Sequence, residues 1–292
     1  IYGAGSPMDS VWNPQSLAAI ERDRLKAFHD QEVTPENMTV YMIGAIDLAT
    51  ARAALNKTFG KWKAKSRSAR KAVGKAPPAE PRVILVDQPG AASSTIVAGH
   101  AIGPYDPATS TELSVLNRIF GGGFESRLNM NLREDKGWSY GYNSAIQSNA
   151  SGDQLLSMQG KVQTDKTAAA MQEIRKEFVV FSSSRPASDS EVERVKTNRI
   201  RSLPGSFDTN RGFLQSMIDA DIYGLPYDYA EGRAERISAV TRDGVEARTK
   251  SLFQPDRLAW VVVGDLAQIE ESVRALDYGS VEVWDAFGNR LR

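Results

Sequence analysis

Two hydrogen-bond donors, Arg133 and Tyr140, have residue types and a spacing that could do chemistry together. They stand seven residues apart, with Gly137 between them. A guanidinium is permanently charged and a phenol keeps its proton near neutral pH, so both groups donate hydrogen bonds. We expect two such donors to bind one carbonyl oxygen. No nucleophile or metal motif accompanies them, so the pair is interpreted as half of a catalytic site.

The elements that must position this pair can be read from the surrounding pattern. Phe124, Leu128 and Leu132 recur every four residues and predict a helix with Arg133 at its C-terminal end, terminated by Gly137. A strand is predicted next, because Tyr140, Tyr142, Ser144 and Ile146 alternate, and its hairpin partner carries Leu156, Met158 and Val162. Upstream, strands are expected at 82–86 and 94–100, and a helix at 110–120 that ends at Gly121, Gly122 and Gly123.

The glycine run and the downstream helices allow further predictions. No Lys-Ser or Lys-Thr follows Gly121–Gly123, so a phosphate-binding P-loop is rejected, and a helix C-cap with a turn is the simpler interpretation. A long helix is predicted at about 165–181. Ser188 and Glu191 form a capping-box pattern for the next helix, which Pro204 is expected to break.

The composition excludes several classes of protein. The 292 residues hold 36 basic and 36 acidic side chains, so there is no basic excess for a nucleic-acid or anionic-membrane partner. No apolar run approaches the ~18 residues of a membrane-spanning helix. Cysteine is absent, which excludes disulfides, thiolate metal sites and cysteine nucleophiles.

The two histidines, His29 and His100, do not form a metal motif. Neither has a second histidine at helical spacing, so no zinc site is predicted within this chain. A paired-carboxylate mechanism lacks a specific second partner for Glu134 or Asp135, and a Ser-His-Asp triad lacks its Gly-x-Ser-x-Gly turn.

An internal repeat relates residues 14–47 to residues 234–267 at a constant offset of 220. Identities at this offset include Ala19/Ala239, Arg22/Arg242, Asp23/Asp243, Ala27/Ala247, Pro35/Pro255 and Gly44/Gly264. Both copies predict a helix, a proline turn, a buried strand (39–43 or 259–263), a glycine and a second helix.

The repeat predicts how the chain is divided. Residues 1–62 are expected to be the tail of a preceding repeat, most of which would lie upstream of Ile1. Residues 63–80 contain a run of basic residues and Pro77-Pro78, and are interpreted as a solvated linker rather than a basic docking patch. Residues 81–292 form the second copy, with subdomains at about 81–185 and 186–292.

The segments 119–128 and 132–140 resemble the C-terminal half of the M16 metallopeptidases, the family of pitrilysin, insulysin and the mitochondrial processing peptidase. Further similar segments are Gly160-Lys161-Val162, Leu203–Thr209, Tyr223–Pro226 and Val263-Gly264-Asp265. The resemblance covers about 81–285, with the tail of the preceding repeat at 1–62. It implies an α+β fold of repeated units, each a largely antiparallel sheet with helices on one face.

The resemblance also implies roles for particular residues. In this family one half carries zinc on a His-x-x-Glu-His motif, and the other half supplies an Arg and a Tyr that match Arg133 and Tyr140. These two would hold a substrate carbonyl and stabilise the charge that develops on its oxygen. Gly121, Gly122, Gly123 and Phe124 would then border the substrate path. Without the family pattern, Arg133 reads as a cation at a helix C-terminus and Tyr140 as a packed strand residue.

Two functions therefore stay open. The first is the non-zinc half of a zinc peptidase that acts on peptides or unfolded polypeptides. Its zinc would come from a missing upstream domain or a partner subunit, and no cofactor would bind to this chain itself. The second is an inactive M16-like subunit that only binds peptides or serves as a scaffold. Family habit suggests a periplasmic or otherwise exported protein and a paired, dimer-like assembly, with a cytoplasmic location as the alternative.

Overall fold

The structure is a computed structural model that describes residues 1–3, 8, 12–63, 77, 80–148 and 152–292. It divides into two compact units, which are described separately. The first unit comprises Ile1–Ser10, Val73–Arg201 and Arg233–Arg292, and the second comprises Val11–Ala72 and Ser202–Gly232. The limits predicted from the repeat (1–62, 63–80 and 81–292) differ from this division and stay a prediction. Most of the predicted linker lies outside the described residues.

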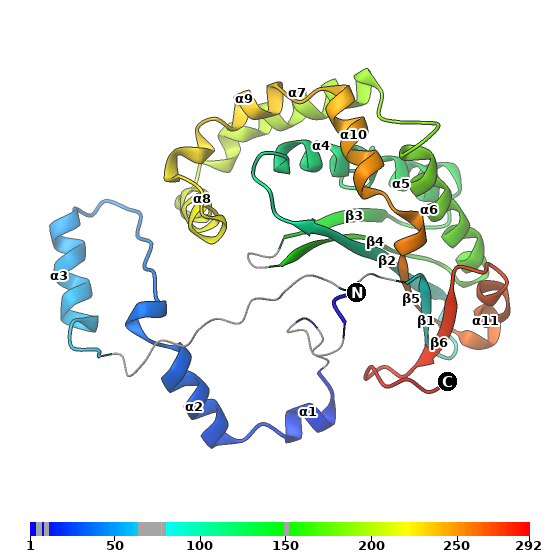
Figure 1. The fold of residues 1–292 in the computed structure, drawn as a ribbon, viewed down its shortest axis with the longest axis horizontal. Coiled ribbons are helices and arrows are strands. Elements are labelled where there is room, and N and C mark those ends of the chain that lie inside the picture. Colours follow the sequence, from blue (N-terminus) through cyan, green and yellow to red (C-terminus); the bar gives the residue numbers. More distant parts are fainter. Residues whose placement is uncertain (4–7, 9–11, 64–76, 78–79, 149–151) are drawn as a thin grey trace. The chain divides into compact units, whose positions relative to one another are not determined.

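A mixed sheet of six strands forms the centre of the first unit (Figure 1). Its order is β3-β4-β2-β5-β1-β6, with the bounds β1 (Arg82–Asp87), β2 (Ser93–Pro104), β3 (Tyr142–Gln147), β4 (Asp153–Gln163), β5 (Ala259–Gly264) and β6 (Ser280–Trp284). The pairs β3–β4, β4–β2 and β2–β5 are antiparallel, whereas β1 runs parallel to both β5 and β6. Runs of β-branched residues such as Val261-Val262-Val263 favour these buried strands.

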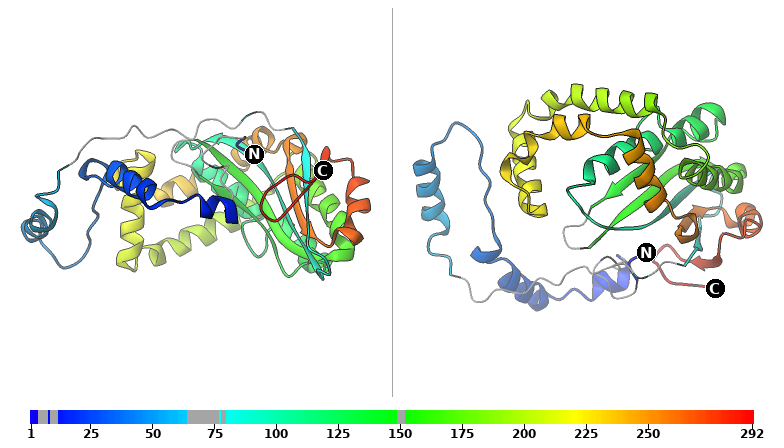
Figure 2. Two further views of the ribbon diagram at one scale, coloured as in Figure 1. Left: turned by 90° about the horizontal axis from the view of Figure 1, so that it is seen from below. Right: turned by 45° about the horizontal axis from the view of Figure 1, so that its top comes forward.

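Helices of the first unit cover one face of the sheet. In Figure 1 most of them lie above the strands, with α11 at the right beside β1 and β6. Figure 2 shows the same helices from two further sides. These helices are α4 (Ser110–Phe120), α5 (Arg127–Asn129), α6 (Thr167–Phe181), α9 (Arg233–Ser238), α10 (Arg242–Leu252) and α11 (Leu266–Arg274), with short 3-10 turns at Thr164–Lys166 and Pro255–Arg257. The predicted α+β fold, a mostly antiparallel sheet with helices on one face, is thereby confirmed.

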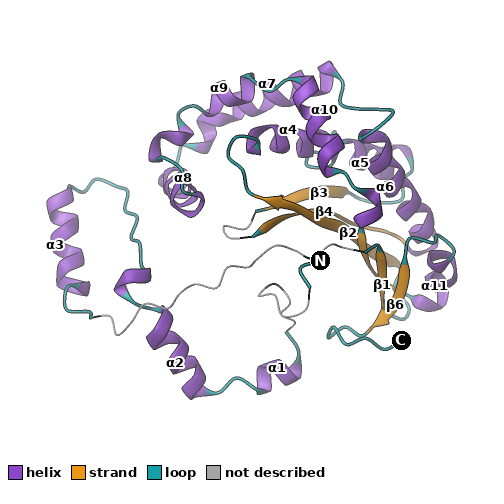
Figure 3. Ribbon diagram, in the orientation of Figure 1, coloured by secondary structure: helices purple, strands orange, loops and turns teal. Residues whose placement is uncertain are grey.

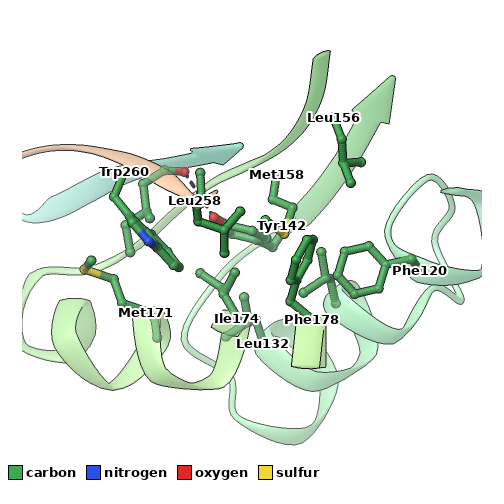
Figure 4. Close-up of a cluster of buried hydrophobic side chains, with 14 of the residues drawn as sticks. Phe120, Leu132, Tyr142, Leu156, Met158, Met171, Ile174, Phe178, Leu258 and Trp260 are labelled. Atoms are coloured by element: carbon green, nitrogen blue, oxygen red, sulfur yellow. Dashed lines mark hydrogen bonds between the residues drawn. The ribbon is translucent and has the colours of Figure 1, made fainter. Parts of the chain in front are cut away.

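A continuous hydrophobic core lies between the sheet and these helices (Figure 4). The side chains of Phe120, Phe178 and Trp260 are almost fully buried there. Phe178 stacks on Phe253 with ring centroids 4.3 Å apart, and Phe120 meets Phe253 edge to face at 4.8 Å. Such aromatic pairs add directional packing to the hydrophobic stabilisation of the core. This core holds α4, α6 and β5 rigidly together.

One long helix, α7 (Asp189–Ser206), begins as predicted but ends later than predicted. Ser188 and Glu191 cap each other reciprocally, since the Glu191 amide donates to Ser188 Oγ and the Ser188 amide donates to Glu191 Oε2. The expected break at Pro204 is wrong, because Pro204 lies inside the helix. The fixed φ of proline is helical, and Pro204 lies in the last turn, so the helix ends only two residues after it, at Ser206.

The second unit is helical in the part that the structure describes. It contains α1 (Pro14–Ala18), α2 (Arg22–Glu32), a 3-10 turn at Pro35–Asn37, α3 (Leu48–Phe59), α8 (Asn210–Tyr223) and a 3-10 turn at Tyr227–Ala230. The strand expected at 39–43 is wrong for this structure: Figure 3 shows loop between the 3-10 turn at Pro35–Asn37 and α3. A strand takes its hydrogen bonds from neighbouring strands, and none lies beside this segment among the described residues of the unit.

No described helix has the length and apolarity needed to cross a membrane.

Candidate functional site

Arg133 stands on a widened helical turn rather than on a regular α-helix. After the short α5, residues Met130–Asp135 adopt a π-helix, and Arg133 is the fourth residue of that turn. Leu128 and Leu132 are fully buried, as their spacing predicted. Phe124 precedes the helix instead of opening it, and its side chain is 61% exposed. Short π-helical segments are rare and occur frequently at functional sites.

The Arg133 guanidinium is held by two neighbours. It lies 4.4 Å from the centroid of the Phe124 ring, a cation–π contact, and its Nε is 3.4 Å from Glu134 Oε1. About a third of the side chain stays exposed. An Arg stacked on an aromatic face keeps its in-plane N–H groups free to donate, so Arg133 is both restrained and available to a ligand.

Tyr140 lies on a turn before strand β3 and not on the strand itself, which corrects the predicted strand start. Gly137, with φ +64°, ends the π-helix in the left-handed region that glycine favours. Trp138 then donates its amide to the Leu132 carbonyl at 3.0 Å and accepts from the Gln163 amide at 3.1 Å. Ser139 Oγ donates to the Lys161 carbonyl at 2.7 Å. Strand β3 begins at Tyr142, two residues after Tyr140.

This turn presents the Tyr140 side chain to solvent. The backbone on each side of Tyr140 is fixed by hydrogen bonds, yet its side chain is fully exposed. A tyrosine packed on a strand face, the alternative reading from sequence, would be at least half-buried, so that reading does not fit this structure. Arg133 and Tyr140 therefore stand at the two ends of one short, internally bonded turn. That the two donors serve the same acceptor stays a prediction.

The glycine run brings the end of α4 close to strand β3. The amides of Gly121 and Gly122 both donate to the Asn117 carbonyl, and the Gly121 carbonyl accepts from the Ser144 amide at 2.9 Å. A Cβ on Gly121 would lie 2.7 Å from the Ser144 nitrogen. Gly123 accepts from Ser126 Oγ at 2.6 Å. These bonds fit the predicted C-cap and turn, while the expected substrate contact of Gly121, Gly122, Gly123 and Phe124 stays a prediction.

A buried polar cluster under the π-helix was not anticipated from sequence. The Asn131 amide group donates to Glu173 Oε2 at 3.0 Å and to Glu177 Oε1 at 2.9 Å, both on α6. Partial burial opposes ionisation of Glu173, but the bonds from Asn131 and Lys176 outweigh it and lower the pKa of this carboxyl. Glu177 also pairs with Arg185. The cluster ties the turn that carries Arg133 to the rigid core helix α6.

A second, half-buried network around Arg127 was also missed. Its guanidinium makes a two-pronged contact with Glu191, at 2.8 and 2.6 Å, and donates to the carbonyl of Pro186 at 2.8 Å. It also lies 4.7 Å from the ring of Phe181. The capping box pointed to Glu191, but no local pattern reveals that its carboxylate faces an arginine 64 residues away. This network fixes α5 against the start of α7.

Neither histidine belongs to a metal site. His100 is buried in the core, where its Nδ1 lies 2.9 Å from the Ala101 carbonyl and its ring meets Phe178 edge to face. Burial lowers the pKa of His100 below its ordinary value of 6.5, which favours the neutral imidazole at pH 7. His29 is exposed beside Asp30. Across the described parts of the chain, no three His, Cys, Asp or Glu side chains are grouped to hold a metal ion, so these residues do not fit a zinc site.

Comparison with known families gives one extended match. The model of the family described as peptidase M16 inactive domain matches residues 19–199. Among curated proteins, an uncharacterized zinc protease of Mycobacterium bovis is 32% identical over 152 residues, which is 50% of this chain and 33% of that protein. A counterpart from Mycobacterium leprae is 29% identical over 152 residues. The chain matches about a third of the length of these relatives.

Solved structures share the fold at low sequence identity. A peptidase M16 inactive domain from Pseudomonas fluorescens superposes with a TM-score of 0.77 at 17% identity, covering 86% of this chain and 59% of that one. A protease from Helicobacter pylori also gives 0.77, at 14% identity, with 86% and 60% covered. The first half of the periplasmic protease PqqL from Escherichia coli gives 0.64 at 15% identity, covering 92% and 62%.

Proposed function

We propose, because this chain belongs to the peptidase M16 inactive domain family, that it is the substrate-binding half of a two-part zinc peptidase. The observation that carries the proposal is the turn from Arg133 to Tyr140. It ends in a restrained guanidinium and a fully exposed phenol. The relatives described as zinc proteases support the same class of activity, and the matched family is described as the inactive domain.

In this proposal the two donors act on the backbone of a bound peptide. Arg133, held on Phe124, donates to a carbonyl oxygen of the substrate and orients the chain. The Tyr140 hydroxyl donates a hydrogen bond to the oxygen of the scissile carbonyl. Negative charge develops on this oxygen as the carbonyl carbon becomes tetrahedral. A fixed donor aimed at developing charge lowers the barrier, because little reorganisation is needed during the reaction.

The metal belongs to a complementary half in this proposal. A zinc ion bound there would supply the activated water, and the described residues of this chain offer no ligand set for it. We infer that peptide or unfolded polypeptide is held between the two halves, with Gly121–Phe124 bordering its path. A periplasmic location is proposed by analogy with PqqL of Escherichia coli, which is described as a periplasmic protease.

Replacing Tyr140 by Phe in the complete, zinc-bearing peptidase tests the role of the phenol. We expect kcat to fall by about 10²–10³ with KM little changed, because the bond strengthens only as charge develops. Since the side chain is fully exposed, the variant keeps its fold. A steady-state assay on an unstructured peptide measures both constants.

The matched control is Tyr227→Phe, which removes a hydroxyl from another exposed tyrosine, 61% accessible. Its kinetics should equal those of the unmodified enzyme. An unchanged kcat in Tyr140→Phe removes this residue from the reaction. If the complete protein cleaves no peptide in the presence of zinc, the alternative of a non-catalytic peptide-binding subunit takes the place of this proposal.

A further inference from the structure

Asn129, a buried asparagine at the end of α5, bonds to the backbone at both ends of the proposed site. Its side chain is 6% exposed and lies between the segment before α5 and the start of strand β3. The Nδ2 group donates to the Phe124 carbonyl at 2.7 Å, and Oδ1 accepts from the Tyr142 amide at 3.2 Å. One side chain therefore joins two separate backbone segments.

The orientation of the Asn129 amide group follows from its two partners. A carbonyl oxygen can only accept a hydrogen bond and a backbone N–H can only donate one, so Nδ2 must face Phe124 and Oδ1 must face Tyr142. Exchanging the two atoms would set oxygen against oxygen and nitrogen against nitrogen. An asparagine therefore suits this place, whereas an aspartate of equal size does not.

Both backbone groups that Asn129 binds need a partner from a side chain. Strand β3 is the edge strand of the described sheet, so an amide that turns away from β4 has no neighbouring strand there. The Tyr142 amide donates to Asn129 instead. Phe124 stands in the turn between α4 and α5, and Asn129 supplies a donor for its carbonyl. Buried backbone groups without partners are costly, so both bonds favour this arrangement.

The two segments that Asn129 joins lie beside the two proposed donors. The Arg133 Cζ atom lies 4.4 Å from the centroid of the Phe124 ring, so the position of this ring restrains the guanidinium. Tyr140 stands two residues before Tyr142, the first residue of β3. A change at either end of the Asn129 amide group would reach one donor and spare the other.

We propose that Asn129 is a positioning residue for the proposed reaction. One end of its amide group holds the Phe124 ring under Arg133, and the other end holds the start of β3 behind Tyr140. The separation of the two donors is thereby set by a buried side chain rather than by the exposed turn between them. This inference rests on the function proposed above.

Two substitutions of Asn129 in the complete, zinc-bearing peptidase separate these tasks. Asn129→Asp keeps the acceptor for the Tyr142 amide but sets a carboxylate against the Phe124 carbonyl. We expect KM to rise about tenfold with kcat changed by less than about twofold, because Arg133 holds the substrate equally in the ground state and the transition state. Asn129→Ala removes both bonds, so kcat should also fall by about tenfold as Tyr140 loses its fixed position.

Asn117→Asp is the matched control. Asn117 is also a partly buried asparagine that joins a helix to β3, since it accepts from Ser144 Oγ at 2.7 Å and donates to the Ser144 carbonyl at 3.4 Å. The same chemical change at this position should alter both constants by less than about twofold. Each variant is assayed below its own melting temperature, so that unfolding does not contribute to the kinetics.

An unchanged KM in Asn129→Asp overturns the proposal, and so does an equal rise in KM when Phe124 has first been replaced by Leu. The proposed function fails on a different result, an unchanged kcat in Tyr140→Phe. A readout without turnover is the NMR resonance of the Arg133 Nε proton, which the Phe124 ring shifts upfield. Asn129→Asp should move this resonance towards its ordinary position and Asn117→Asp should not. An unmoved resonance in Asn129→Asp overturns the proposal even if the protein cleaves no peptide.

Discussion

Some polar side chains in the sheet-containing unit bind each other, and others face solvent from a fixed position. The first kind stabilises the fold, and the second kind is suited to binding a ligand. Arg127 and Glu191 satisfy each other inside the protein, with Glu191 also bonded to Ser188. Tyr140 instead stands fully exposed on a fixed turn. An exposed phenol gains nothing for folding, so its fixed position suits a ligand. The residues that hold the turn and the residues proposed to bind substrate are therefore different, and they can be tested separately.

Glu191→Gln should lower the free energy of unfolding at neutral pH. It should also make that free energy less sensitive to pH in the acid range. Partial burial opposes the charge on Glu191, but the bonds from Arg127 and Ser188 outweigh it and lower its pKa from 4.5 to about 2. A depressed folded pKa stabilises the protein above about pH 4.5, and this contribution is lost as pH falls from 4.5 towards 2. Removing one charged partner should cost roughly 2 kcal/mol at neutral pH. Urea unfolding at several pH values measures it.

Glu193→Gln is the control for this change. Glu193 stands on the same helix and its side chain is well exposed. Its carboxylate forms an ion pair with Lys196. The Lys196 side chain is only 13% exposed, but the Glu193 side chain is 64% exposed and its carboxylate well hydrated, so removing its charge should change stability by less than about 1 kcal/mol. Equal effects of the two substitutions would contradict the structural role assigned to the Arg127–Glu191 pair.

At the scale of elements, close approaches fix the geometry around the site. The end of α4 meets β3 where Gly121 contacts Ser144, and the π-helix is tied to α6 through Asn131. The sequence predicted α4 to the residue, and it predicted the hairpin of β3 and β4. It did not predict the π-helix, because the extra width depends on contacts with α6, 42 and 46 residues away.

Gly121→Ala should be strongly destabilising because of the space that a Cβ would need, although Gly121 does not have a positive φ. Its Cβ would lie 2.5 Å from Ser144 Oγ and 2.7 Å from the Ser144 nitrogen, so the helix end and the strand must move apart. Overpacking of this kind typically costs about 1–3 kcal/mol. Thermal unfolding measures the loss. Gly141→Ala is the control, because its Cβ would meet only Asn129 Oδ1 at 3.5 Å and should leave the melting temperature nearly unchanged.

At the scale of the whole molecule, the first unit is a complete layer of helices on a sheet, while residues 12–63 have local structure without a core. In α1, α2 and α3 no side chain is buried. The repeat makes this contrast specific, because the side chains at the matching positions of the second copy are buried.

The isolated 292-residue chain should neither bind zinc tightly nor cleave peptides. Its two histidines, His29 and His100, are far apart in sequence, and one is buried with a lowered pKa while the other is exposed beside Asp30. After dialysis against micromolar zinc, metal analysis should find well under one equivalent, and a chelator should leave the melting temperature unchanged. Stoichiometric zinc, or zinc-dependent cleavage by this chain alone, would contradict the assignment of the metal to a complementary half.

The sequence by itself determined the features that depend on nearby residues. Three such features are helix α4, the Ser188–Glu191 cap and the turn at Gly137. Each depends on hydrogen bonds within a few positions of the chain, and so do the helices and turns that the repeat relates. The sequence also showed the family resemblance and the seven-residue spacing of Arg133 and Tyr140.

Only the tertiary structure decided the features that need distant partners. It shows that residues 39–44 are not a strand, that Tyr140 stands before β3, and that Arg133 lies on a π-helix. The physical reason is the same in each case. Helical bonds close within one segment, whereas strands, buried ion pairs and widened turns take their partners from elements far away in sequence.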